Sequence, residues 1–278
     1  MIYSFDLTRS YTNAGRYLVS RVGHFAGNSV TIRVSNFLSS TLTRNSVLRR
    51  MTMAKTQLLE QLDAAIAKKN LLNHPFYQDW QAGKLTKENL QLYAAQYYRH
   101  VEAFPKHLRV LAARTEGSIR AIVEENLAEE ENPAASHPKL WRDFAGALGV
   151  EEDDITCCPA MPGTQKVVQT FREICGDRSV PEAVAALYAY EAQVPEIATT
   201  KIDGLKKFYN ITQPEALAYF EVHEEADKAH RAAWRNWLAD NATENDEEIL
   251  ATTNEALDAL WGALDAVYQT KACSAVTH

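Results

Sequence analysis

Residues 219–234, YFEVHEEADKAHRAAW, place His223, Asp227 and His230 at helical spacings of four and three residues. At about 100° per residue, these side chains share one helical face within roughly 60° of one another. Trp234 and the opening tyrosine extend the same stripe by one turn each way, which predicts that this face points inward. Two imidazoles and a carboxylate are costly to bury without partners, and metal coordination is the usual remedy. The alternative interpretation is a solvated run of charge, which HEEADK also resembles.

Further ligands must come from other helices, because one helix supplies at most three. Glu191 shares a predicted helical face with Leu187 and Val194, where a core residue is normally found. Pro195 cannot donate the hydrogen bond that the carbonyl of Glu191 would accept, so we expect a kink there. The alternative is a buried glutamate that a tyrosine or a lysine satisfies.

Two more candidates precede Glu191 in the chain. Glu130 continues the apolar stripe of Val123 and Leu127, and His137 follows seven residues later in ASHP, at a predicted helix start. By itself His137 fits a capping or surface histidine equally well. The complete predicted ligand set is Glu130, His137, Glu191, His223, Asp227 and His230.

Three carboxylates and three imidazoles suit two octahedral first-row ions that share a bridging carboxylate. Such a mixed oxygen and nitrogen shell is typical of iron or manganese rather than of structural zinc. It is the bundle-core arrangement of carboxylate di-iron proteins, although their usual Glu-x-x-His pair is absent.

The pattern from Ala54 onward is helical throughout. TKENLQLYAAQYYRHVEAFPKHLRVLAAR is long and periodic after a Thr86 cap, and Gly149 is placed to end HPKLWRDFAGALG. Ser179 and Glu182 form a capping box that opens a further helix. This part of the chain shows no convincing β alternation, phosphate loop or repeat. We therefore expect an all-α fold, a single bundle of about seven or eight helices over residues 51–278.

The first fifty residues differ in composition from the rest. They carry seven arginines, one acid and no lysine, so the total charge of −7 divides into +6 for residues 1–50 and −13 for residues 51–278. This basic, Ser-rich leader resembles a mitochondrial transit peptide by composition. A plainer interpretation is that translation starts at Met51 or Met53. In either case we expect the leader to be disordered or to lie outside the mature fold.

Composition also limits compartment and partners. With 46% hydrophobic residues, a mean hydropathy of −0.32 and no long apolar run, the chain is typical of a soluble globular protein. Its acidic body argues against nucleic acid or an anionic membrane as a partner. The four cysteines match no zinc module, which indicates reduced thiols in a cytoplasmic compartment.

Several motifs carry a resemblance to a known family. They are NHPFYQDW, NLAEEEN, LWRDFAGALGV, VAALYAYEAQVPEIATTKIDGL and AYFEVHEEADKAHR. From Met53 to about Thr270 the chain resembles the family of the chlamydial protein associating with death domains. That family has a heme-oxygenase-like di-metal fold linked to folate metabolism. Only the leader and the C-terminal tail depart from its pattern.

The resemblance implies an activity and roles for particular residues. Family members are thought to make p-aminobenzoate by an oxygen-dependent route that consumes part of the protein itself. Tyr77 matches the tyrosine whose ring is cut out, and Lys201 matches the proposed amino donor. Three further tyrosines match those near the metals: Tyr93, Tyr190 and Tyr219.

The resemblance also implies cofactors and assembly. The six predicted ligands fall where the family binds two divalent ions, Fe/Fe or Fe/Mn, and O2 and an unidentified external reductant act as co-substrates. Family members tend to be homodimers. Without the resemblance, Tyr77 and the other tyrosines fit ordinary core aromatics, and Lys201 fits a solvated helix end.

Three other functions remain open from the sequence. One is a related bundle enzyme that acts on an exogenous small molecule, such as a thiamin-fragment hydrolase with an active-site cysteine or a cofactor oxidase. Another is a non-enzymatic module that binds a death-domain partner. Heme oxygenase is the weakest alternative, because it needs one proximal histidine in an open apolar cleft.

Overall fold

The computed structural model describes the backbone of residues 6–11, 17–25, 28–34, 56–241 and 246–275. Side chains are described from residue 56 to 270, apart from 242–245. The chain divides into two units, Met1–Met53 and Ala54–His278. The predicted start residues Met51 and Met53 and the side chain of Cys273 lie outside the described residues.

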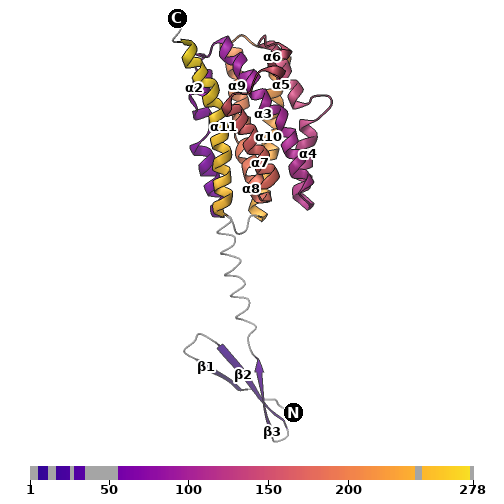
Figure 1. The fold of residues 1–278 in the computed structure, drawn as a ribbon. Coiled ribbons are helices and arrows are strands. Elements are labelled where there is room, and N and C mark those ends of the chain that lie inside the picture. The colour runs from indigo at the N-terminus through magenta and orange to yellow at the C-terminus, as the bar shows by residue number, and fades with distance from the viewer. Residues whose placement is uncertain (1–5, 12–16, 26–27, 35–55, 242–245, 276–278) are drawn as a thin grey trace. The chain divides into compact units, whose positions relative to one another are not determined.

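The first unit contains a small antiparallel sheet, drawn in Figure 1. Its strands, in sheet order, are β1 (Asp6–Tyr11), β2 (Tyr17–Phe25) and β3 (Asn28–Val34). These strands lie in the leader and were not predicted. Val30, Ile32 and Val34 alternate with polar residues, which is the period of a strand. The expectation that the leader lies outside the mature fold stays a prediction.

The second unit is a helical bundle, so the all-α prediction is confirmed for the body of the chain. The backbone is helical over residues 56–68, and a 3-10 turn, η1 (Leu71–Asn73), follows. The α-helices are α2 (Pro75–Gln81), α3 (Lys87–Ala113), α4 (Gly117–Glu130), α5 (His137–Ala147), α6 (Glu152–Cys157), α7 (Pro162–Asp177), α8 (Val180–Glu191), α9 (Val194–Phe208), α10 (Pro214–Asn241) and α11 (Asp246–Ala275). The described part therefore has more helices than the seven or eight expected.

The extra helices have two physical origins. The short helices α2 and α6 were not recognised, because one or two turns carry too little periodicity to be distinguished from a loop. The expected kink at Pro195 is a complete break, because α8 ends at Glu191 and α9 begins at Val194. The side chain of Gln193 accepts a hydrogen bond from the backbone N–H of Leu71 at 2.9 Å. The break therefore leaves Glu191 as the last residue of a buried helix.

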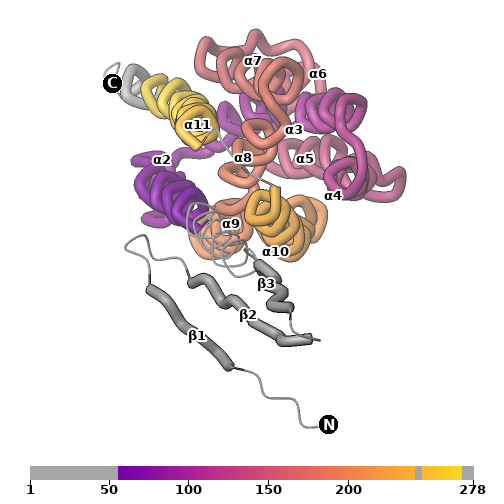
Figure 2. The backbone as a smooth tube through the Cα atoms, turned by 90° about the horizontal axis from the view of Figure 1, so that it is seen from below, coloured from indigo at the N-terminus to yellow at the C-terminus, as the bar shows by residue number. Residues whose placement is uncertain are grey.

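Helix α8 runs through the middle of the bundle, as the end-on view in Figure 2 shows. All of its residues from Glu182 to Glu191 are buried, and its alanines let the neighbouring helices pack closely. Because α8 is covered on all sides, the carboxylate of Glu191 at its end lies in the core.

None of the described helices combines the length and apolar character needed to cross a membrane.

The helix caps predicted from the sequence are present in the structure. Thr86 caps α3 in a capping box with Asn89, and Ser179 caps α8 in a capping box with Glu182. Gly149 follows the end of α5 with a φ of +82°, a conformation that a side chain would strain. Local sequence therefore fixes the ends of the helices that carry the site.

Candidate metal centre

The structure brings the predicted ligand side chains together in two buried groups. Within each group, one ligand atom from every residue lies within 4.8 Å of the others. Each of these residues is at most 8% exposed, so the interpretation of the motif on α10 as a solvated run of charge is wrong for them. The groups are Glu130, His137 and His223, and Glu191, Asp227 and His230.

In the first group, two imidazoles lie near a carboxylate but form no hydrogen bond with it. Nδ1 of His137 lies 2.9 Å from Oε1 of Glu130, yet it is buried and forms no hydrogen bond with any described residue. Nδ1 of His223 lies 2.6 Å from the backbone carbonyl of Tyr219, which can only accept, so Nδ1 carries the proton. Nε2 of His223 therefore keeps a lone pair for a metal ion.

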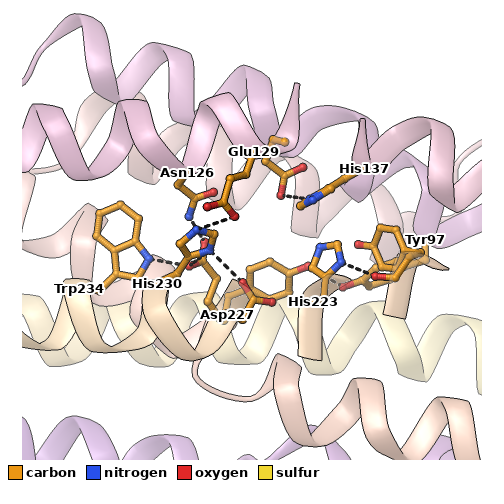
Figure 3. A network of polar contacts seen from close by, with 12 residues as sticks. Tyr97, Asn126, Glu129, His137, His223, Asp227, His230 and Trp234 are labelled. Carbon is orange, nitrogen blue, oxygen red and sulfur yellow. Dashed lines mark hydrogen bonds and ion pairs between the residues drawn. The ribbon is translucent and has the colours of Figure 1, made fainter. Parts of the chain in front are cut away.

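In the second group, two donors hold the Glu191 carboxylate in place. Asn126 donates to Oε1 at 2.9 Å, and the indole N–H of Trp234 donates to Oε2 at 2.6 Å. Both contacts are drawn in Figure 3. The alternative in which a tyrosine or lysine satisfies Glu191 is therefore wrong. Contacts of this kind orient metal-binding carboxylates in proteins.

Asp227 lies between the two groups. Its Oδ1 is 3.2 Å from Nδ1 of His230, whereas its Oδ2 is buried and has no described hydrogen-bond partner. Figure 3 shows this carboxylate between His230 and His223. Nε2 of His230 lies 3.3 Å from the carboxylate of Glu129, which is not one of the predicted ligands. Asp227 would therefore be the candidate for a carboxylate shared by two ions.

The electrostatics of the second group also favour a cation. Burial raises the pKa of Glu191 to about 8, and the Asp227 charge adds to this effect. Burial raises the pKa of Asp227 to about 6. Burial lowers the pKa of His230, but the hydrogen bond to Asp227 and the Glu191 charge outweigh it and raise the pKa to about 9. Desolvated carboxylates of this kind are stabilised by a divalent ion, so the donor set and its unpartnered atoms fit two metal sites.

Tyr77, Tyr93 and Lys201 form a chain of contacts in the same bundle. The Tyr77 hydroxyl lies 3.4 Å from the Tyr93 hydroxyl, which accepts a hydrogen bond from Nζ of Lys201 at 2.6 Å. Lys201 is only 4% exposed, so its interpretation as a solvated helix end is wrong. Nζ lies 5.0 to 5.6 Å from the centroids of five aromatic rings, those of Tyr77, Tyr93, Tyr97, Trp141 and Phe220.

The surroundings of Lys201 change its chemistry. Burial lowers the pKa of its amine to about 7, and no carboxylate in the described part of the chain pairs with it. The amine is therefore substantially neutral at physiological pH, as a nitrogen nucleophile must be.

Aromatic rings connect the first metal group to these tyrosines. The Tyr219 ring stacks on His223 with ring centroids 4.1 Å apart. The centroids of the Trp141 and Tyr219 rings are 4.8 Å apart. Trp141 also lies 5.7 Å from Tyr93. A continuous path of ring contacts therefore runs from the candidate ligand His223 to the buried phenols.

Some residues of the site were not predicted. The Tyr97 hydroxyl hydrogen-bonds the predicted Tyr190 hydroxyl at 2.9 Å, Trp141 joins the ring path, and Asn126 holds Glu191. Each of the three lies one helical turn from a predicted site residue on the same helix. The four-residue spacing in the sequence could therefore have found them.

The interior beside the tyrosines is nearly filled. A cavity of about 20 Å3, lined in part by Tyr77, Tyr93 and Tyr97, has room for about one water molecule. This space is far too small for a heme.

Comparison with known proteins supports the family resemblance noted from the sequence motifs. Residues 91–261 match the family of iron-containing redox enzymes. A 4-aminobenzoate synthase of Nitrosomonas europaea is 41% identical over 230 residues, which cover 78% of this chain and 93% of the relative. A 4-aminobenzoate synthase of Chlamydia muridarum is 38% identical over 216 residues, which cover 77% and 92%.

A solved structure shows the same fold at lower sequence similarity. A TenA homolog from Pseudomonas syringae pv. tomato superposes with a TM-score of 0.67 at 18% identity, over 77% of this chain and 92% of that one. Identity at this level supports the fold alone. The family match and the two closely similar synthases go further, and they show that this chain belongs to the family of iron-containing redox enzymes.

Proposed function

We propose that this protein is an oxygen-dependent di-metal enzyme that makes p-aminobenzoate from the ring of its own Tyr77, with Lys201 as the amino donor. The observation that carries the proposal is the position of Nζ of Lys201. This buried amine lies 5.6 Å from the Tyr77 ring centroid and 2.6 Å from the Tyr93 hydroxyl. The similarity to relatives named 4-aminobenzoate synthase supports the same product.

The two buried groups would each hold one divalent ion, with Asp227 as the shared carboxylate. The mixed oxygen and nitrogen donors favour Fe/Fe or Fe/Mn over structural zinc. When bound, the ions supply the chemistry that reduces O2 to an oxidant able to take an electron from a phenol. Asn126 and Trp234 keep the Glu191 carboxylate oriented toward its ion.

The protein residues control the path of the electron and the proton. Burial raises the pKa of Tyr77 and that of Tyr93 far above the usual range, so both phenols keep their protons until they are oxidised. The electron that Tyr77 loses would pass through the Tyr93 contact into the ring path of Trp141 and Tyr219. The proton released can pass through the Tyr93 hydroxyl to the neutral amine of Lys201.

The atoms of the product can be assigned to the residues that supply them. p-Aminobenzoate is a tyrosine ring whose Cβ has become a carboxylate and whose phenol oxygen has been replaced by an amine. Its formation requires cleavage of the Cα–Cβ bond of Tyr77 and oxidation of Cβ to a carboxylate with oxygen from O2 or water. The nitrogen of Lys201 takes the place of the phenol oxygen, which leaves as water, and hydrolysis of the bond between this nitrogen and Cε leaves Cε as an aldehyde. The oxidation of Cβ and Cε releases electrons to O2, and an external reductant supplies the remaining electrons that O2 reduction needs. Each chain then gives one product molecule, because Tyr77 is consumed.

Isotope labels test this origin of the product directly. Protein labelled with 13C in tyrosine rings and 15N in the lysine side chain is supplied with iron, a reductant and O2, and the product is analysed by mass spectrometry. We expect p-aminobenzoate that carries both labels. Replacement of Lys201 with arginine should abolish the product, whereas the matched change at exposed Lys206 on the same helix should not. An unlabelled ring in the product would refute Tyr77 as its source.

The structure gives no support to a cysteine-dependent hydrolase. Cys175 is buried, and burial raises the pKa of its thiol to about 12, so it stays protonated at neutral pH. Cys157 and Cys158 are free thiols at the end of the short helix α6. The likeness to a TenA homolog is one of fold alone.

A further inference from the structure

The product of the proposed reaction forms in a closed interior. Tyr77 is only 2% exposed, and the cavity beside it has room for about one water molecule. A benzene ring with two polar substituents cannot leave through such a space. The bundle must therefore open along one seam between helices.

One seam is lined by polar groups that the folded protein leaves unsatisfied. Helices α3 and α7 lie side by side, and the His100 ring on α3 contacts Phe171 on α7 with centroids 5.3 Å apart. Both ring nitrogens of His100 and Nε2 of His107 are buried without a described hydrogen-bond partner. Buried polar groups without a partner destabilise a folded protein, so a role for these nitrogens is expected.

These side chains can form hydrogen bonds with a polar molecule that moves along the seam. Burial lowers the pKa of His100 to about 3 and that of His107 to about 4, so both imidazoles are neutral. A neutral imidazole offers one donor and one acceptor. His100 lines the inner cavity beside the tyrosines, whereas His107 lies further along α3, where the seam reaches the surface.

The outer end of the seam is a groove of about 560 Å3 between α3 and α7. Arg99, Lys106 and Arg172 line it, with one acid, Glu102. Thr164 lines both this groove and the inner cavity, so the two spaces share a wall. A groove with three cations is unusual on a body whose formal charge is −13, and it is complementary to an anion.

The three cationic side chains of the groove differ in whether they already have a partner. Arg99 already donates to the carbonyls of Thr156 and Cys158, and Lys106 lies 3.6 Å from Glu102. Arg172 is exposed, and no carboxylate in the described part of the chain pairs with it. Its planar guanidinium matches a carboxylate in geometry.

We propose that the α3–α7 seam is the release path of the aromatic carboxylate product, and that Arg172 in the outer groove binds the product carboxylate. His100, Thr164 and His107 give the path a polar lining from the tyrosines to the surface. This inference rests on the proposed function, since it takes p-aminobenzoate as the molecule that must leave.

Binding to the unreacted protein tests the groove without any turnover. p-Aminobenzoate and its neutral analogue p-aminobenzamide are titrated into the wild type, Arg172→Glu and the matched control Lys166→Glu, which reverses an exposed charge on α7 outside the groove. We expect Arg172→Glu to weaken binding of the carboxylate about fivefold or more, with little effect on the amide. Lys166→Glu should resemble the wild type. Equal losses in the two variants would overturn the groove as the carboxylate site.

Release after one turnover tests the path. Free product in a rapid filtrate is compared with total product in the denatured protein, and we expect the free fraction to rise more slowly in Arg172→Glu than in Lys166→Glu. Equal release rates, with product present in both, would overturn the seam as the exit. An absence of product in the denatured protein of every variant would instead refute the proposed function.

Discussion

Replacement of Lys201 with methionine is expected to stabilise the metal-free protein and to abolish product formation. Burial lowers the pKa of the amine from 10.5 to about 7, which corresponds to on the order of 5 kcal/mol of folding free energy lost at neutral pH. Methionine is similar in length and apolar, so it keeps the packing against the five rings. Loss of the hydrogen bond to Tyr93 costs about 1 kcal/mol, so a net gain of a few kcal/mol remains.

The pH dependence identifies the cause of this gain. Because the folded pKa lies below the unfolded pKa, the unfolded chain binds more protons between about pH 7 and 10.5, and the stability of the wild type rises with pH across this range. The advantage of Lys201→Met should therefore be largest at and below pH 7 and should shrink toward pH 10.5. Urea unfolding of both proteins at several pH values measures the difference.

A control on the same helix separates this effect from a general one. Lys206 is exposed on α9, and Lys206→Met should change the free energy of unfolding by less than about 0.5 kcal/mol at every pH. A Lys201→Met protein that is less stable than the wild type at pH 7, or whose advantage does not vary with pH, refutes the buried neutral amine. Product formation by this variant refutes Lys201 as the nitrogen donor.

Three further substitutions probe the metal centre and the alternative chemistry. Trp234→Phe keeps the packing but removes the donor to Glu191, so metal affinity in a chelator competition should fall about 10-fold or more; unchanged affinity contradicts this role. His137→Ala should lose the ion of its own group and keep the other, which metal analysis of the purified variant measures; full retention of both ions contradicts the grouping. Cys175→Ala should still form p-aminobenzoate, at a cost of about 1 kcal/mol in urea unfolding; loss of product would instead favour thiol chemistry.

The sequence predicts the parts of the site that depend on local geometry. His223, Asp227 and His230 share one face because helical spacing alone places them there. Pro195 marks the end of α8, and therefore the position of Glu191, because its ring and missing N–H cannot continue the helix. The division of the ligands into two groups depends on how four helices pack against one another, and no local pattern encodes that packing.

Other features needed tertiary information. Lys201 is buried because α2, α3, α5 and α10 each place an aromatic ring around its amine. Helical spacing along α9 does not reveal these rings, so the residues alone predict a solvated helix end. Glu129 reaches His230 although it lies on the outer side of the predicted stripe, because a long side chain can extend around the helix. The roles of Tyr77 and Lys201 came only from family resemblance, since a buried tyrosine by itself is an ordinary core residue.

The most direct test of the account is peptide mass analysis of the protein before and after reaction with iron, a reductant and O2. The account predicts that the peptide containing Tyr77 loses the ring carbons and Cβ of this residue in proportion to the p-aminobenzoate released, and that Tyr77→Phe forms none. An unaltered Tyr77 in protein that has released p-aminobenzoate would contradict the account.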